Sequence, residues 1–165
     1  KRPGSTRWAS FIDLESVVLV DMPGFGHAER LSKTAIEEAK RQVIGNLEEW
    51  GNRIVVAILI LDLPLFDEIV SRWESRGEIP IDIEFYDFLS EISQHVIIVA
   101  NKSDRVRRAD LNDTISHVRT KMLLAVPDRK PRIIAFSAVE RTGLRELKEE
   151  VENLVRSVGL SRPSW

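Results

Sequence analysis

Cysteine is absent from the 165 residues of this chain. Its absence excludes disulfide bonds, thiolate catalysis and cysteine-ligated zinc, and it is compatible with a reducing cytoplasm, where we expect the protein to act. No uninterrupted apolar run approaches the roughly 18 residues of a membrane-spanning helix, so no membrane association is expected. The first residues lack the apolar core of a signal peptide. The formal charge of −2 disfavours broad, nonspecific attraction to nucleic acid.

The motif G-x-x-x-x-G-K-[ST] is missing as well. In proteins that carry it, the glycine-rich backbone and the lysine hold nucleotide phosphates. The chain also begins without methionine, at Lys1, in a stretch that has the composition of a loop. We therefore expect a segment of a few tens of residues upstream of Lys1.

Apolar patterns typical of strands and of helices alternate along the chain, which favours an α/β fold with a mostly parallel sheet. The short strands expected over 8–14 and 17–20 can form only an antiparallel hairpin, because parallel strands need a longer crossover. The runs 54–61 and 95–100 are rich in valine and isoleucine and unbroken in polarity, which predicts strands buried on both faces. A further strand is expected over 132–136.

Helices are expected in the segments between and after these strands. The length suits one domain, which we place over 1–158, followed by a frayed tail over 159–165. The expected helices cover 31–47, 67–74, 82–93, 111–125 and 143–158.

The tetrad Asp21, Met22, Pro23 and Gly24 directly follows an expected strand. Ligands of open α/β sheets bind at the carboxyl ends of the strands. A carboxylate there can hold Mg²⁺ through water, because this ion prefers oxygen ligands and keeps part of its hydration shell. Gly24 leaves its backbone N–H able to approach a phosphate oxygen. Pro-Gly pairs also mark ordinary turns, so the tetrad alone leaves a plain turn open.

A second tetrad, Asn101, Lys102, Ser103 and Asp104, also follows a strand. The Asp104 carboxylate can accept hydrogen bonds from the N1–H and the exocyclic amine of guanine, a donor pair that adenine lacks on that edge. Asn101 would contact the base and tie neighbouring loops together, and the stem of Lys102 would cover the base. A turn with an Asx bond stays open for the tetrad alone, but its position after a buried strand favours a guanine reader.

Two further stretches are weaker signals. After the third strand, the small residues Ser137 and Ala138 would let the Ala138 backbone N–H reach the guanine carbonyl oxygen. Near the start, Thr6 could place its hydroxyl on a metal ion and its backbone N–H on the terminal phosphate. Taken singly, each is typical of an ordinary turn or loop.

Taken along the chain, from Thr6 through Asp21–Gly24 and Asn101–Asp104 to Ser137 and Ala138, the four stretches resemble the later motifs of P-loop GTPases in the expected order. Their details are most similar to the EngB (YihA) family, ribosome-associated GTPases also connected with cell division, and the resemblance covers essentially the whole chain. It depends on Arg-Pro-Gly-Ser-Thr over 2–6, Asp-Met-Pro-Gly-Phe-Gly over 21–26 and, as in archaeal members, 72–80. It implies a GTP site formed by Gly4, Ser5, Thr6, Asp21, Met22, Pro23, Gly24, Asn101, Lys102, Ser103, Asp104, Phe136, Ser137 and Ala138.

The resemblance also implies a three-layer α/β/α G domain with one antiparallel edge strand. The family's first strand lies between those over 17–20 and 54–61, and its absence would cost both neighbours a ladder of backbone hydrogen bonds. The implied protein is a monomeric switch that hydrolyses GTP to GDP with Mg²⁺ on Thr6 and Asp21. Its implied partner is a ribosomal particle or ribosomal RNA, in assembly of the large subunit.

Phe25 stands where many small GTPases carry a glutamine that orients the attacking water. Hydrolysis should therefore be slow, with the water placed by backbone, by K⁺ or by a partner, and no catalytic residue is assigned. Two other classes stay open: a pseudo-GTPase interaction module, and an ATP-using P-loop enzyme, which the guanine-reading tetrad disfavours. Two basic clusters are equally compatible with contacts to RNA phosphates and with solvated charge: Arg105, Arg107 and Arg108, and Lys130 with Arg132.

Overall fold

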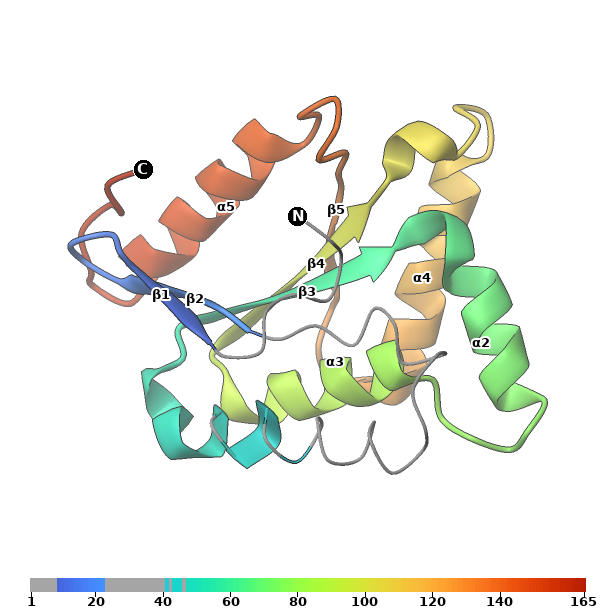
Figure 1. Ribbon diagram of the computed structural model, residues 1–165, viewed down its shortest axis with the longest axis horizontal. Coiled ribbons are helices and arrows are strands. Elements are labelled where there is room, and N and C mark those ends of the chain that lie inside the picture. The colour runs from blue at the N-terminus through green and yellow to red at the C-terminus, as the bar shows by residue number, and fades with distance from the viewer. Residues whose placement is uncertain (1–8, 23–40, 42, 46) are drawn as a thin grey trace. The chain divides into compact units, whose positions relative to one another are not determined.

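The computed structural model describes residues 9–22, 41, 43–45 and 47–165 (Figure 1). The chain divides into two compact units, one made of Lys1–Gly51 with Gly159–Trp165 and one of Asn52–Val158. The first contains a two-stranded antiparallel sheet, and the second a three-stranded parallel sheet. The α/β class expected from the sequence is confirmed.

The antiparallel sheet is the hairpin that the sequence predicts. Its strands are β1 (Ser10–Asp13) and β2 (Val18–Asp21). The Leu14 backbone N–H donates to the Val17 oxygen at 2.9 Å, and Glu15 takes a left-handed conformation with φ of 66°. The antiparallel pairing expected for these two strands is therefore confirmed. The described residues from 41 to 50 are helical, where the sequence predicts the end of a helix.

The C-terminal tail belongs to the same unit as the hairpin. The sequence predicts that this tail frays, but the Ser164 backbone N–H donates to the Leu14 oxygen at 3.2 Å. Pro163 beside it is buried. The expectation of a frayed tail is therefore wrong, because it considered only composition and not a backbone partner far away in sequence.

The parallel sheet has the strand order β3 (Val56–Asp62), β4 (His95–Asn101) and β5 (Arg132–Ala135). Its register aligns Asp62 with Asn101. All three strands therefore end at one edge of the sheet, and the loops that follow them start side by side.

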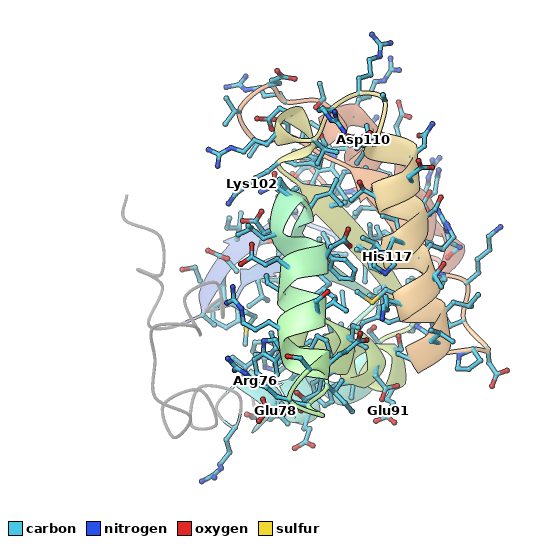
Figure 2. All side chains as sticks on the ribbon, turned by 90° about the vertical axis from the view of Figure 1, so that its right-hand side faces the viewer. Arg76, Glu78, Glu91, Lys102, Asp110 and His117 are labelled. Carbon is cyan, nitrogen blue, oxygen red and sulfur yellow. The ribbon has the colours of Figure 1, made fainter. Side chains whose placement is uncertain are left out.

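Helices lie on both sides of this sheet (Figure 1). Figure 1 shows α5 on one side and α3 and α4 on the other. The helices α2 and α4 run side by side (Figure 2), and His117 Nδ1 lies 2.7 Å from Asp67 Oδ1 between them. The α-helices are α2 (Phe66–Glu74), α3 (Ile81–Ile92), α4 (Leu111–Ala125) and α5 (Leu144–Ser157). The short 3-10 helices are η2 (Gly51–Arg53), η3 (Leu63–Leu65) and η4 (Ser103–Arg105).

The core follows the central strand. In β4 every residue between its two ends is buried, as the sequence predicts for a strand covered on both faces. The same expectation is wrong for β3, where Ile60 is 63% exposed and Ile58 36% exposed. Ile58 and Ile60 lie on one face of the strand, while Ala57 and Leu61 on the other face are buried, so only one face of β3 is well covered. In the described part of the chain, no helix is long and apolar enough to cross a membrane.

Candidate functional site

The loops that follow β4 and β5 are joined to one another at the carboxyl edge of the parallel sheet. The Phe136 backbone N–H donates to the Ala100 oxygen at 2.9 Å, and the Ser103 N–H donates to the Phe136 oxygen at 3.0 Å. Hydrogen bonding between the two strands thus continues beyond their ends. The second tetrad and the Phe-Ser-Ala stretch, 32 residues or more apart in sequence, are brought together as one surface.

Asn101 makes a side-chain bond between these loops. Its Oδ1 accepts a hydrogen bond from the Ala138 backbone N–H at 3.3 Å. This confirms the prediction that Asn101 ties neighbouring loops together. The Ala138 N–H, expected to face a guanine carbonyl oxygen, is directed at the Asn101 amide in the structure.

The loop after β5 is held in shape by Ser137 and Gly143. Ser137 is fully buried, its Oγ accepts from the Glu140 N–H at 3.1 Å, and its own N–H donates to the Thr142 oxygen at 3.2 Å. Gly143 has φ of 76°, and a β-carbon there would lie 2.3 Å from the Ala135 oxygen. Sequence reasoning missed this glycine, although a glycine between a strand and a helix is a recognisable signal of a tight turn.

Asp104 is exposed on the 3-10 turn η4. The turn is closed by the Arg105 N–H, which donates to the Lys102 oxygen at 2.9 Å, and by the Val106 N–H, which donates to the Ser103 oxygen at 3.2 Å. Within the described residues, the Asp104 carboxylate has neither a hydrogen-bond nor an ion-pair partner. A carboxylate that is fixed by its backbone and lacks a protein partner is available to a ligand with paired donors.

Lys102 has a left-handed backbone, with φ of 62° and ψ of 31°. Its ammonium donates to the carboxylate of Asp62, the last residue of β3. Figure 2 shows Lys102 near the start of α2. Asp62 was missed in the sequence, where the only signal is an acid directly after an apolar run.

A second carboxylate lies close to this ion pair. Asp82 stands in the first turn of α3. Burial, and to a lesser degree the negative charge of Asp62, raises the pKa of Asp82 from 3.8 to about 6. Asp62 is therefore within electrostatic reach of Asp82 while its own charge is paired with Lys102.

Of the other site residues predicted from the sequence, the structure describes only some. Asp21 is exposed at the end of β2, as expected, and Met22 follows it. The described residues contain no group of three or more His, Cys, Asp or Glu side chains able to hold a metal ion. The predicted residues that lie outside the described part of the chain are Gly4, Ser5, Thr6, Pro23, Gly24 and Phe25.

The two basic clusters lie at opposite edges of the parallel sheet. Arg105, Arg107 and Arg108 follow the carboxyl end of β4, whereas Lys130 and Arg132 stand at the amino end of β5. Arg132 donates to the Glu150 carboxylate, so its charge is paired within the protein. The clusters do not combine into one basic surface.

The parallel sheet with helices on both sides and the joined loops at its carboxyl edge are features of a G domain, the fold of GTP-binding switch proteins. No protein-family model matches the chain. A solved structure described as a probable GTP-binding protein engB has a TM-score of 0.81 and 34% identity, covering 95% of this chain and 84% of that chain.

Curated relatives agree with this class. The chain is 35% identical over 149 residues to "Probable GTP-binding protein EngB" of Methanosarcina mazei, covering 90% of this chain and 71% of the relative. It is 38% identical over 162 residues to the protein of the same name from Methanopyrus kandleri, covering 96% and 79%. The Pyrococcus horikoshii protein is 34% identical over 156 residues, covering 94% and 71%. The chain belongs to the EngB family.

Proposed function

We propose that this protein binds GTP and GDP and hydrolyses GTP with Mg²⁺, as a monomeric cytoplasmic switch whose G domain spans 1–158. The observation that carries the proposal is the joined edge of β4 and β5. There Asn101 holds the Ala138 loop, and the Asp104 carboxylate has no partner among the described residues. The printed names of the relatives, which describe GTP-binding proteins, support it.

Base recognition follows from the chemistry of this edge. The Asp104 carboxylate accepts from guanine N1–H and the exocyclic amine, and rejects adenine because that base leaves the acid unpaired. A bound guanine carbonyl oxygen would accept from the Ala138 N–H, which in the structure donates to Asn101 Oδ1. Lys102, Ser103, Phe136 and Ser137 shape the loops around the base.

The other predicted residues would bind the phosphates and the metal ion. The exposed Asp21 carboxylate at the end of β2 fits an ion that is held through water. Mg²⁺ would be held by Asp21 and the Thr6 hydroxyl and would supply neutralisation of phosphate charge. Gly4, Ser5, Met22, Pro23 and Gly24 would line the phosphates with backbone N–H groups.

Hydrolysis is proposed to be slow. Phe25 offers no group that could orient water, so the water is placed by backbone, by K⁺ or by a partner. The partner we propose is a ribosomal particle or its RNA during large-subunit assembly, contacted in part by Arg105, Arg107 and Arg108 through phosphates. A role in cell division is carried over from the family.

Nucleotide titration of the full-length protein tests the proposal. We expect saturable binding of fluorescent GDP that ATP does not displace, and release of phosphate from GTP that requires Mg²⁺. Absence of GDP binding would favour a pseudo-GTPase interaction module instead. Equal binding of ATP and GDP would remove the guanine reader. Cosedimentation with large ribosomal subunits, compared between GDP and a non-hydrolysable GTP analogue, tests the partner separately.

A further inference from the structure

Asp62 joins two strand ends that are distant in sequence. It is the last residue of β3, and the register of the sheet places it beside Asn101, the last residue of β4. Its carboxylate accepts from Lys102 Nζ, across 40 residues of sequence. Ion pairs of the same unit also join distant elements elsewhere, as Lys121 with Glu74 does between α4 and α2, whereas others are local, such as Arg72 with Glu68.

The lysine is constrained at both ends of its side chain. Its φ of 62° is a left-handed conformation, which is unfavourable for residues other than glycine and persists only where the surroundings enforce it. A lysine stem has four flexible carbons, and without an anchor it samples many rotamers. The backbone turn fixes the near end of the stem, and Asp62 fixes the ammonium. The stem therefore follows one path across the edge of the sheet.

The local charge favours this arrangement. The side chain of Asp62 is 27% exposed and that of Lys102 is 42% exposed, so water screens the pair only in part. Asp82 in the first turn of α3 adds a second acid close to Asp62. The ammonium is thus held on the β3 side of the loop, at the Asp62 carboxylate.

We propose that Asp62 is a positioning residue of the nucleotide site, which anchors the Lys102 ammonium so that the lysine stem forms a preorganised platform for the base. The proposal depends on the proposed function, since it requires a base to be bound beside Lys102. Preorganisation of a contacting side chain improves affinity by lowering the entropy lost on binding. Asp62 itself touches neither the base nor the reacting phosphate.

The test is Asp62→Asn in the full-length protein, which keeps the size of the side chain and removes its charge. We expect the Kd for fluorescent GDP and the KM for GTP to rise roughly five-fold, the scale of one partly exposed ion pair. The kcat should stay unchanged, because the lysine contacts the base and not the transferred phosphate. Asp62→Glu should recover part of the affinity.

A double-mutant cycle with Lys102→Met shows whether Asp62 acts through the lysine. Methionine keeps an apolar stem but has no ammonium, so adding Asp62→Asn to it should leave the Kd unchanged. Additive effects, or an unchanged Kd in Asp62→Asn, would overturn the proposal. If Asp62→Asn does not fold, the single variant Lys102→Met still removes the ion pair between Asp62 and Lys102. An unchanged Kd for GDP in that variant would also overturn the proposal.

Glu74→Gln serves as the matched control. Glu74 is the last residue of α2 and pairs with Lys121 of α4, at the other end of α2 from Lys102, and its loss should leave the Kd for GDP unchanged. An equal loss of affinity in this control would identify a general structural effect and overturn the positioning role. A wild-type protein that binds no GDP would refute the proposed function and with it this role, whereas wild-type binding without a response to Asp62 refutes the role alone.

Discussion

The Asn101 side-chain oxygen accepts a hydrogen bond from the Ala138 backbone N–H at 3.3 Å, and so connects loops that lie 37 residues apart. Backbone bonds already align the same loops, from Phe136 to Ala100 and from Ser103 to Phe136. The amide adds a link at the point where a base would be received. Its effect should therefore be larger on nucleotide binding than on folding.

We expect Asn101→Ala to lower the free energy of unfolding by about 1 kcal/mol, the usual net value of one hydrogen bond. Loss of both this tie and a base contact should weaken GDP binding by on the order of tenfold or more. Urea denaturation and fluorescent GDP titration measure the two effects. Asn153→Ala is the control, because Asn153 is exposed on α5 and accepts a hydrogen bond from Arg156 within the same helix. Equal GDP affinity in wild type and Asn101→Ala would contradict the assignment.

Gly143→Ala should destabilise the protein strongly. A β-carbon at this position would lie 2.3 Å from the Ala135 oxygen, and the φ of 76° is unfavourable for alanine. Gly77→Ala separates the two effects, since its φ of 70° is similar but, among the described residues beyond its chain neighbours, no atom lies within 4 Å of a β-carbon there. We expect a loss of about 1 kcal/mol for Gly77→Ala, from backbone strain alone, and a loss at least about 2 kcal/mol greater for Gly143→Ala. Equal urea midpoints for Gly77→Ala and Gly143→Ala would show that the loop before α5 accommodates the β-carbon without loss of stability.

Asp104→Asn should change which base is bound. The amide presents a donor where the carboxylate accepts, so guanine loses a partner and xanthine, with a carbonyl oxygen in place of the exocyclic amine, gains one. We expect GDP affinity to fall by roughly two orders of magnitude or more, with xanthosine diphosphate preferred. Competition between the two nucleotides measures the change. Asp110→Asn, which removes an acid paired with Arg107 on the same loop, should keep the preference for guanine.

Local pattern was sufficient to predict most of the fold. The helix over 111–125 has the expected bounds, and the strand expected over 95–100 extends by one residue. These segments have strong periodicity or a continuous apolar run, and their own residues determine their structure. The expectation that β3 is buried on both faces was wrong because exposure depends on which other elements cover each face, and the face with Ile58 and Ile60 is left exposed. No pattern within 54–61 carries that information.

Some residues of the candidate site could also be predicted from local sequence, and others could not. Asn101 and Asp104 could be found from their order after a strand, and the Asn101 tie is confirmed. Asp62 could not, because its significance comes from a register that aligns it with Asn101 and from an ammonium 40 residues away. Gly143 was missed because its requirement depends on the approach of the Ala135 oxygen from the preceding strand. Long-range contacts decide both cases.

Asp82→Asn should stabilise the protein at neutral pH. Burial and the charge of Asp62 raise the pKa of Asp82 in the folded protein to about 6, against 3.8 without these influences. The folded state therefore retains the proton up to a higher pH than the unfolded state does. The stability that this group contributes is fully present below about pH 4 and is lost as the pH rises through 6. Above that pH the ionised acid is a cost of on the order of 3 kcal/mol, which an amide avoids.

One opposing effect is smaller. Asp82 lies in the first turn of α3, where the helix dipole favours a carboxylate by about 0.3–1 kcal/mol, and the amide loses this contribution. The net gain for Asp82→Asn should thus be about 2 kcal/mol at pH 7.5 and should vanish near pH 4, where Asp82 is neutral in the folded protein. Asp87→Asn, on the exposed side of the same helix, should show no such dependence. Urea denaturation of the three proteins across this range measures the difference, and a gain independent of pH would show that the acid is ionised in both states.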